Sequence, residues 1–354
     1  MRQAFSEIDV AFGSSHPPGD IVEYGRIAER EGFDSIWLAE LYYHRGLISV
    51  ASAVAANTER IKLGLGIVSP FSRHPGVIAM EAATLDEMSG GRLLLGVGIS
   101  QIAVDRQGIT DAKPAVSLRE AIEILRGFFA GETVVYDGRF FKMAAPGARL
   151  GFTPRRRSVP IYVGGMGPKS LELAGRIADG AILGMFSTPG FIRYVRESVE
   201  KGLRASGRTW QHFDLRSYIT FSIHEDSRLA KDATRKILVE YLSERVSTSA
   251  SNLGSPRLRY SGVDEREFAR VKSGVMQYMA QGRPEEAEQS IPVELIDRLI
   301  VAGTPAECRA KLKEYLDAGL DVPVLYHVLG PDTKTGIRLA AKEILPMRRR
   351  DPSP

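Results

Sequence analysis

Apolar and polar positions follow two different rhythms along the chain. Short β-branched or apolar runs are separated by longer segments in which apolar residues recur at helical spacing, which predicts repeated βα units and a parallel sheet. The predicted strands cover residues 8–12, 35–39, 61–65, 93–97, 161–163, 181–183, 213–223 and 322–328. Because a helical pattern follows each of these eight runs, we predict a closed (β/α)8 TIM barrel of the α/β class, with an open doubly wound sheet as the alternative.

Signals at helix ends support the helical segments. The predicted helices cover residues 20–31, 47–57, 75–88, 117–129, 168–178, 189–206, a stretch from Ser227, 305–318 and 332–345. Thr304 and Pro305 provide a capping residue followed by proline at the first helical position, and Gly319 follows the same helix. Both ends of this helix are therefore marked in the sequence.

Two intervals are too long for simple connections between elements. Residues 131–159 contain VVYDGRFF, in which Asp137 and Gly138 lie between apolar flanks and indicate a hairpin. Residues 245–292 are polar and precede the last βα unit. We therefore predict a single barrel domain over residues 1–354, with insertions after strands four and seven and a disordered basic tail near 347–354.

Composition narrows the class of protein. The 354 residues are 44% hydrophobic and 25% charged, as is typical of a globular protein. The single cysteine, Cys308, excludes a disulfide or cysteine–metal framework, and no apolar run reaches membrane-spanning length. The net charge is only +4, without a basic stripe. We therefore expect a cytoplasmic protein with no metal, nucleic-acid or membrane partner, and a mildly basic surface that favours anionic ligands.

The segment PIYVGGMGPKSLELAGRIADGAILG, residues 160–184, combines a strand, a glycine-rich turn, a helix and a second strand. Gly164, Gly165 and Gly167 would let the backbone approach a ligand closely, and the helix after Pro168 offers free N–H groups at its positive end. This arrangement suits a phosphate group. A tight strand-to-helix connection without a ligand explains the segment equally well.

In a barrel, catalytic and binding residues are expected at the carboxyl ends of the strands. The candidates there are Glu40, Tyr42 and His44 after strand two, Gly66, Ile67 and Val68 after strand three, Gly98, Ser100 and Gln101 after strand four, and His327 at strand eight. The glycines at these ends would keep the backbone close to a flat or extended ligand. Each polar side chain also has a structural interpretation. For Glu40 it is an ion pair with Arg45 or Arg73, and for Tyr42 and His327 it is packing or an ordinary position on the rim.

Four segments together resemble a known family. They are GFDSIWLAE, IKLGLGIVSPFSRHPGVIAMEAATLDEMSGGRLLLGVG, the strand-five segment and VAGTPAECRAKL. In this order, and over nearly the whole chain, they are similar to the bacterial-luciferase-like superfamily. Within it, the chain most resembles the branch that uses the deazaflavin coenzyme F420, especially the methylenetetrahydromethanopterin reductases.

The resemblance implies a cofactor site and a dimer. A bulge with a non-prolyl cis peptide, behind the deazaflavin ring, maps to Gly66-Ile67 beside Val68. The loop from Gly98 to Gln101 would lie over the ring, and residues 131–159 would form one wall. Relatives pair through barrel helices, so a homodimer is expected. The phosphate-contacting turn maps to Gly164, Gly165, Met166, Gly167, Pro168 and Lys169.

The chain departs from the family at three positions. Relatives carry a histidine beside the acid after strand two, whereas Leu41 follows Glu40 here. Deazaflavin-dependent sugar-phosphate dehydrogenases have an acid where this chain has Gln101, and the reductases have a glutamate in strand one where it has Ala11. An amide or a methyl group does not transfer protons near neutral pH as a carboxyl does. The departures weaken the case for those particular reactions.

Three functional hypotheses follow. The first is an oxidoreductase in which reduced F420 passes hydride to an activated C=C, C=N or C=O bond of a small-molecule substrate. The second is an FMN-dependent luciferase-like monooxygenase with the same phosphate turn. The third is a cofactor-binding relative without catalysis, or a flavin-free hydride-transfer enzyme. In the first hypothesis Glu40 and Gln101 are the catalytic positions, with Glu40 the acid, and the substrate contacts are Tyr42, His44, Ser100 and His327.

Overall fold

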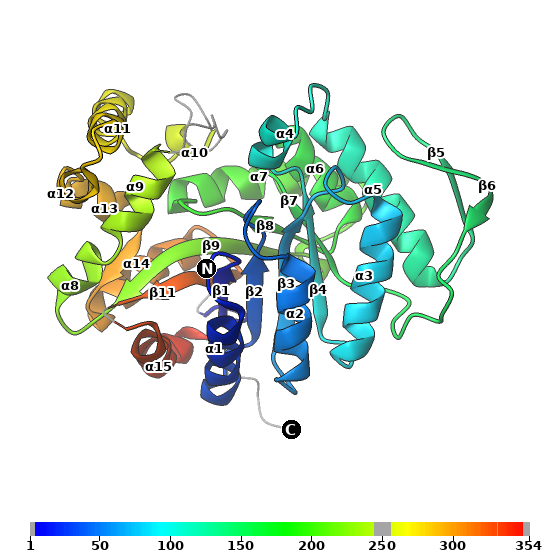
Figure 1. Cartoon of the computed structure of the whole chain (residues 1–354), viewed down its shortest axis with the longest axis horizontal. Helices are drawn as coiled ribbons and strands as arrows, with labels where there is room; N and C mark the ends of the chain where they lie inside the picture. Colours follow the sequence, from blue (N-terminus) through cyan, green and yellow to red (C-terminus); the bar gives the residue numbers. More distant parts are fainter. Residues whose placement is uncertain (1–3, 244–255, 331, 350–354) are drawn as a thin grey trace. The chain divides into compact units, whose positions relative to one another are not determined.

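The computed structural model describes residues 4–243, 256–330 and 332–349 (Figure 1). In this part of the chain, nine strands form one sheet in the order β10-β9-β11-β1-β2-β3-β4-β7-β8, and β9 also pairs with β8. Without β10, the remaining eight strands follow one another around a closed barrel in chain order. The predicted TIM barrel is therefore confirmed, and the open doubly wound sheet was the wrong alternative.

The chain forms two compact units, and three elements belong to both. The N-terminal unit comprises residues 11–183 and 197–216, and the C-terminal unit comprises residues 1–10, 184–196 and 217–354. The shared elements are β1 (Asp9–Gly13), α7 (Pro189–Ala205) and β9 (Asp214–Ile223).

In the N-terminal unit, parallel strands alternate with helices (Figure 1). Helix α3 (Pro75–Met88) spans the predicted residues, and α4 (Gln101–Arg106) is a short helix that the sequence pattern did not predict. The further elements are α1 (Pro18–Glu31), β2 (Ser35–Ala39), α2 (Leu47–Ala56), β3 (Lys62–Val68), α3 (Pro75–Met88), β4 (Leu93–Gly98), α4 (Gln101–Arg106), α5 (Pro114–Ala130), β5 (Val134–Asp137), β6 (Lys142–Ala148), β7 (Ile161–Gly164), α6 (Pro168–Ile177), β8 (Gly180–Leu183) and the 3₁₀ helix η1 (Trp210–His212).

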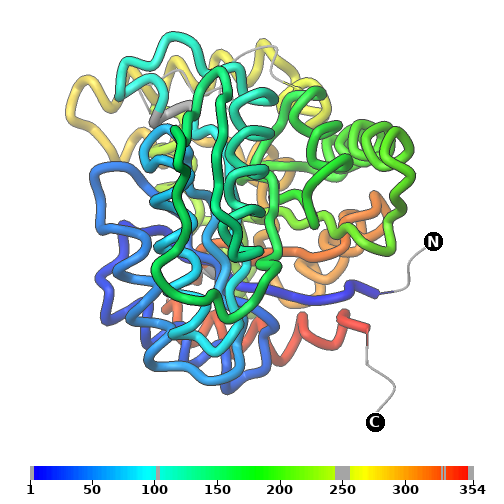
Figure 2. The backbone as a smooth tube through the Cα atoms, turned by 90° about the vertical axis from the view of Figure 1, so that its right-hand side faces the viewer, coloured from blue at the N-terminus to red at the C-terminus, as the bar shows by residue number. Residues whose placement is uncertain are grey.

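The insertion after the fourth βα unit contains the predicted hairpin. Strands β5 and β6 pair in antiparallel register, with Asp137 opposite Lys142 and the Gly138 N–H donating to the Phe141 carbonyl oxygen. The hairpin extends along the outside of α3 and α5 in both views (Figures 1 and 2). The hairpin prediction from Asp137-Gly138 is confirmed.

Large side chains fill the interior of the N-terminal unit below the carboxyl ends of its strands. Trp37 occupies the space beside Gly64, where an added Cβ would lie 2.0 Å from the indole ring. The buried Arg216 guanidinium lies 5.8 Å from the Trp37 ring centroid and 5.0 Å from that of Tyr162, and Arg216 Nε is 2.9 Å from an Asp214 carboxylate oxygen. Because side chains fill this layer, we expect a ligand to bind at the carboxyl ends of the strands.

The C-terminal unit is mainly helical outside its strands. In the insertion predicted over residues 245–292, the described part forms helices α10 to α12, which the sequence pattern did not predict. Helix α11 forms here because Phe268, Val271 and Val275 recur at helical spacing and are buried in one cluster with Leu238 and Leu242. The elements are α8 (Ser227–Asp232), α9 (Arg235–Ser243), α10 (Pro256–Arg259), α11 (Glu265–Ala280), α12 (Pro284–Gln289), α13 (Val293–Leu299), β10 (Val301–Gly303), α14 (Pro305–Asp317), β11 (Val322–Leu329), α15 (Thr333–Ile344) and the 3₁₀ helix η2 (Leu345–Met347).

The start of the predicted basic tail is part of the fold. The Phe5 N–H donates to the Met347 carbonyl oxygen at 3.1 Å, and the Arg349 N–H donates to the Phe5 carbonyl oxygen at 2.7 Å. Residues 350–354 of that prediction lie outside the described residues.

Candidate functional site

Strand β3 ends in an irregular segment. Its register against β4 shifts between Leu65 and Val68, and the Gly66–Ile67 peptide bond is cis. Both features confirm the bulge that the family resemblance implied at this point. The Ile67 side chain is half-buried, whereas Gly66 and Val68 are buried. The bulge therefore presents one apolar side chain at the carboxyl end of the strand.

Ile67 lies against β4, which pairs with β3, and against β7, the next strand beyond β4. An added Cβ would lie 2.9 Å from Ile67 Cδ1 if placed on Gly98, and 2.6 Å from Ile67 Cγ2 if placed on Gly164. We had interpreted these glycines as keeping the backbone close to a ligand. Ile67 occupies the space that a Gly164 side chain would need, and at Gly98 the Gly164 carbonyl oxygen, 2.6 Å from the added Cβ, limits the space as well. The role of both glycines beside a ligand stays a prediction.

The glycine turn after β7 leads directly into α6. Gly167 is the N-cap of this helix, it has a φ of −79°, and it makes no side-chain capping hydrogen bond. Gly167, Pro168 and Lys169 are exposed, and a Cβ added to Gly167 would meet nothing within 4 Å. Gly164, Gly165 and Met166 are half-buried. The turn thus offers open space at an uncapped helix N-terminus, an arrangement that favours an anion.

Glu40, at the carboxyl end of β2, is held by Arg73. Arg73 Nη2 lies 2.7 Å from Glu40 Oε1, Nη1 donates to Oε2 at 2.9 Å, and the Glu40 side chain is only 8% exposed. Arg73 Nε also lies 3.5 Å from Glu81 Oε2 on α3. The hydrogen bond to Glu40 raises the pKa of Arg73, and burial raises the pKa of Glu81. The structure thus contains the Glu40–Arg73 ion pair that we named as the alternative to an acid.

The Tyr42 hydroxyl lies at the same rim. It donates to Ser72 Oγ at 3.4 Å, and Ser72 Oγ donates to the Ser69 carbonyl oxygen at 3.0 Å. Burial and the nearby Glu40 carboxylate raise the pKa of Tyr42, so its hydroxyl stays protonated at neutral pH. In contrast, the neighbouring Tyr43 is 74% exposed with a φ of 67°, and His44 is exposed. Like Glu40, Tyr42 thus contacts the segment that follows the bulge.

The loop after β4 turns at once into α4. The half-buried Ser100 accepts the Val104 N–H on its carbonyl oxygen at 3.0 Å, which starts the helix. Gln101 is the first residue of α4, and the place of its side chain lies outside the described part of the structure. The roles of Ser100 and Gln101 therefore stay predictions.

His327 belongs to the C-terminal unit, where it is a half-buried residue of β11. It has a φ of 70°, and its ring centroid lies 3.8 Å from that of Tyr326.

The same unit contains a fully buried acid, Asp9, in β1. Burial is the main cause of the raised pKa of Tyr218, and the charge of Asp9 contributes to it. The sequence analysis did not single out Asp9 as a buried charge, although a charged residue inside an apolar run was the signal for it.

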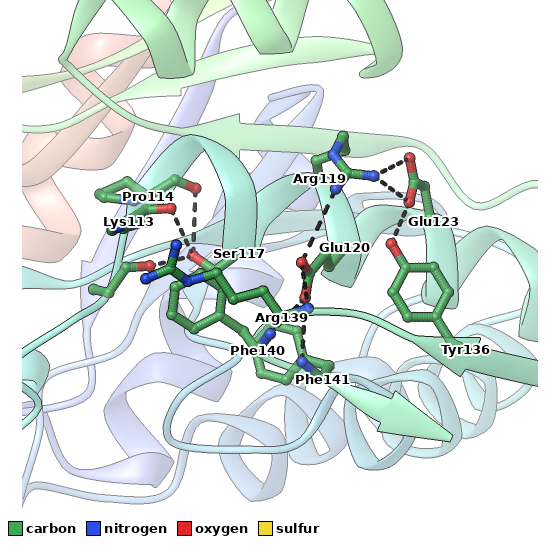
Figure 3. Close-up of polar contacts among 11 residues, drawn as sticks. Lys113, Pro114, Ser117, Arg119, Glu120, Glu123, Tyr136, Arg139, Phe140 and Phe141 are labelled. Atoms are coloured by element: carbon green, nitrogen blue, oxygen red, sulfur yellow. Dashed lines mark hydrogen bonds and ion pairs between the residues drawn. The ribbon is translucent and has the colours of Figure 1, made fainter. Parts of the chain in front are cut away.

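The hairpin of the insertion is anchored by a buried carboxylate on α5. Glu120 accepts the backbone N–H groups of Arg139, Phe140 and Phe141 (Figure 3). The rings of Phe140 and Phe141 lie 5.9 Å and 5.8 Å from that of Phe71, in the segment after the bulge. The insertion thus contacts the segment that follows the bulge. That it forms a wall of the ligand site stays a prediction.

Two features are absent from the described residues. They contain no group of three or more His, Cys, Asp or Glu side chains that could hold a metal ion. They also contain no helix that is both long and apolar enough to cross a membrane.

Comparison with known proteins identifies the family. The sequence model of the luciferase-like monooxygenase family matches residues 4–322. The 5,10-methylenetetrahydromethanopterin reductase of Archaeoglobus fulgidus is 34% identical over 326 residues, which are 91% of this chain and 94% of that protein. The F420-dependent glucose-6-phosphate dehydrogenase of Microbacterium testaceum is 30% identical over 348 residues, which are 94% of each chain.

A solved structure agrees with the sequence relatives. The coenzyme F420-dependent tetrahydromethanopterin reductase of Methanopyrus kandleri has a TM-score of 0.87 at 26% identity, covering 98% of this chain and 100% of that one. The barrel fold together with these relatives shows an enzyme of the luciferase-like oxidoreductase class. The chain belongs to the luciferase-like monooxygenase family, and the resemblance drawn from its sequence is confirmed.

Proposed function

We propose that this protein is an oxidoreductase that uses coenzyme F420 to act on a small-molecule substrate. The observation that carries the proposal is the similarity, over more than nine-tenths of the chain, to two kinds of enzyme whose names include this coenzyme, the tetrahydromethanopterin reductase of known structure and the glucose-6-phosphate dehydrogenase. Their substrates differ, so the shared element is the cofactor. The proposal therefore commits to F420 and leaves the substrate as an activated C=C, C=N or C=O compound.

The residues at the rim fit a deazaflavin with a phosphate-bearing tail. Residues 164–169 would hold the phosphate, because Gly167 leaves open space at the uncapped N-terminus of α6 and Lys169 is exposed beside it. Gly66 to Val68 would hold the flat ring against the apolar Ile67 side chain. When bound, the deazaflavin supplies the hydride chemistry.

The chain's own polar residues would orient the substrate. Tyr42 is a neutral hydroxyl donor beside the segment after the bulge, and Glu40 is a carboxylate fixed by Arg73. The further proposed contacts are His44, Ser100, Gln101 and His327. We also propose a cytoplasmic homodimer, as expected from the family. Ala11 and Gln101 replace family acids, so neither relative's substrate transfers directly to this chain.

A binding titration tests the proposal. Purified full-length protein is titrated with oxidised F420, FMN and nicotinamide dinucleotides, and saturable one-to-one binding is expected for F420 alone. Binding of FMN in its place would support the monooxygenase alternative, which the family's name keeps open. If none of the three binds, both flavin-type functions are contradicted. Reduced F420 is then offered with methylenetetrahydromethanopterin as hydride acceptor, and oxidised F420 with glucose 6-phosphate as hydride donor, the substrates that the relatives' names indicate.

A further inference from the structure

The segment between β3 and α3 is held from two sides. Residues 69–74, here called the 69–74 loop, directly follow Val68 of the bulge. On one side, Arg73 binds Glu40 and Ser72 accepts the Tyr42 hydroxyl. On the other side, aromatic residues of the loop contact the tip of the hairpin. The position of the rim residues therefore depends on what fixes this loop.

The contact with the hairpin tip is aromatic. The Phe71 ring lies 5.9 Å from that of Phe140 at an interplanar angle of 89°, and 5.8 Å from that of Phe141. The His74 ring lies 5.8 Å from that of Phe141 at 87°. These edge-to-face and tilted arrangements have favourable quadrupole interactions. Burial lowers the pKa of His74, which keeps its ring neutral in this contact.

The hairpin tip is in turn held by Glu120. This side chain is 2% exposed, and its two carboxylate oxygens accept three successive N–H groups, those of Arg139 at 2.9 Å, Phe140 at 2.9 Å and Phe141 at 3.2 Å (Figure 3). A Cβ added to Gly138 would lie 2.4 Å from Glu120 Oε2, so the tip is closely packed against the carboxylate. Hydrogen bonds to an ionised acceptor are stronger than neutral ones.

We propose that Glu120 is a positioning residue for the ligand site: it fixes the hairpin tip, and Phe140 and Phe141 fix the 69–74 loop. Loosening the tip would release Arg73 and Ser72, and with them Glu40 and Tyr42. Glu120 is buried under the hairpin, so it acts through these residues without contacting the ligand. Only the identity of the ligand rests on the proposed function, because the packing from Glu120 to the loop is independent of it.

The test compares Glu120→Gln with Glu123→Gln. Glu123 lies one turn further along α5, and its carboxylate accepts from Tyr136 of the hairpin, so the control also removes a carboxylate from a hairpin contact but leaves the tip intact. Two readouts are used: amide hydrogen exchange of peptides covering residues 139–141 and 69–74, and the Kd for oxidised F420. Glu120→Gln should raise exchange in both segments and weaken F420 binding about tenfold, the size of a typical coupling between separate sites. Glu123→Gln should do neither.

Other outcomes overturn the proposal. If exchange rises at 139–141 but not at 69–74, the tip and the loop are independent. If both segments loosen while the Kd is unchanged, the loop does not position the ligand site. If the wild type itself does not bind F420, the proposed function fails, whereas the exchange readout still tests the linkage. Should Glu120→Gln not fold, Phe141→Leu removes the ring contacts while keeping an apolar side chain, and the same two readouts apply.

Discussion

Ile67 occupies the space that a side chain on Gly164 would need. A Cβ added to Gly164 would lie 2.6 Å from Ile67 Cγ2, closer than non-bonded carbon atoms approach. The same isoleucine limits Gly98, where the added Cβ would lie 2.9 Å from Cδ1. The missing side chains of Gly98 and Gly164 thus leave room for the bulge of β3, and at Gly98 also for the Gly164 carbonyl oxygen, 2.6 Å from the added Cβ.

Gly164→Ala should therefore strain the bulge. We expect the free energy of unfolding to fall by about 1–3 kcal/mol, as for other cases of overpacking in a close-packed region. Replacing Ile67 by alanine in the same chain removes the clashing methyl group and should recover part of the loss. Denaturant unfolding of the wild type, both single variants and the double variant measures this coupling. Strictly additive losses would show that the two residues do not compete for space.

Gly167→Leu should separate ligand binding from stability. Gly167 is exposed, its φ of −79° suits any residue, and an added Cβ meets nothing within 4 Å, so the free energy of unfolding should fall by only about 1 kcal/mol, the cost of an aliphatic residue at a helix N-cap. A leucine there would fill the space beside the N-terminus of α6, and F420 binding should be lost. The matched control is Gly19→Leu in the first turn of α1, which also has open space. Retained F420 affinity in Gly167→Leu would contradict the phosphate assignment.

Much of the fold could be predicted because it depends on local patterns. Strand and helix periods gave the barrel, and Asp137-Gly138 gave the hairpin turn. Helices α10 to α12 were missed because their polar composition dominated the apolar spacing of Phe268, Val271 and Val275. Tertiary packing of a narrow apolar stripe decided that segment.

The candidate site was only partly predictable. Position after a strand identified Glu40, Tyr42 and the glycine turn, because strand ends meet at one rim. The role of Glu120 could not be predicted, since its partners are the backbone N–H groups of residues nineteen to twenty-one positions further along the chain. Likewise, a glycine in a strand does not reveal which side chain fills its space.

Tyr42→Phe tests the rim donor. Its hydroxyl is the protonated donor next to the 69–74 loop, so removing it should lower kcat/KM about a hundredfold if it stabilises charge on the substrate, while the Kd for F420 stays the same. Tyr43→Phe is the matched control, because that side chain is 74% exposed. The pKa of Tyr42 is raised above its ordinary value, so its hydroxyl keeps the proton at neutral and mildly alkaline pH. Deprotonation of Tyr42 should therefore not lower the rate in that pH range. Equal values of kcat/KM for the two variants would show that the Tyr42 hydroxyl has no role in the reaction.

Glu81→Gln should stabilise the protein at neutral pH. Burial raises the pKa of Glu81, the Glu40 charge adds to the shift, and Arg73 opposes it. A carboxyl with a raised folded pKa binds its proton more tightly in the folded state. Stability is therefore lost as pH rises from the ordinary glutamate pKa through the folded one, and stays lower above it. The variant should exceed the wild type in unfolding free energy at pH 7, with the difference vanishing below the ordinary glutamate pKa.

Glu40→Gln should have the opposite effect on stability, although Glu40 contacts the same Arg73 guanidinium as Glu81. It removes the 8% exposed carboxylate that binds Arg73 in two places, so it should lower the unfolding free energy at pH 7, where Glu81→Gln raises it. Urea unfolding of both variants and the wild type from pH 4 to pH 8 measures the two signs. If Glu81→Gln were also destabilising at pH 7, its attraction to Arg73 at 3.5 Å would outweigh the cost of burying its charge. Glu40 and Glu81 would then be equal partners of one cation, rather than one bound carboxylate and one strained neighbour.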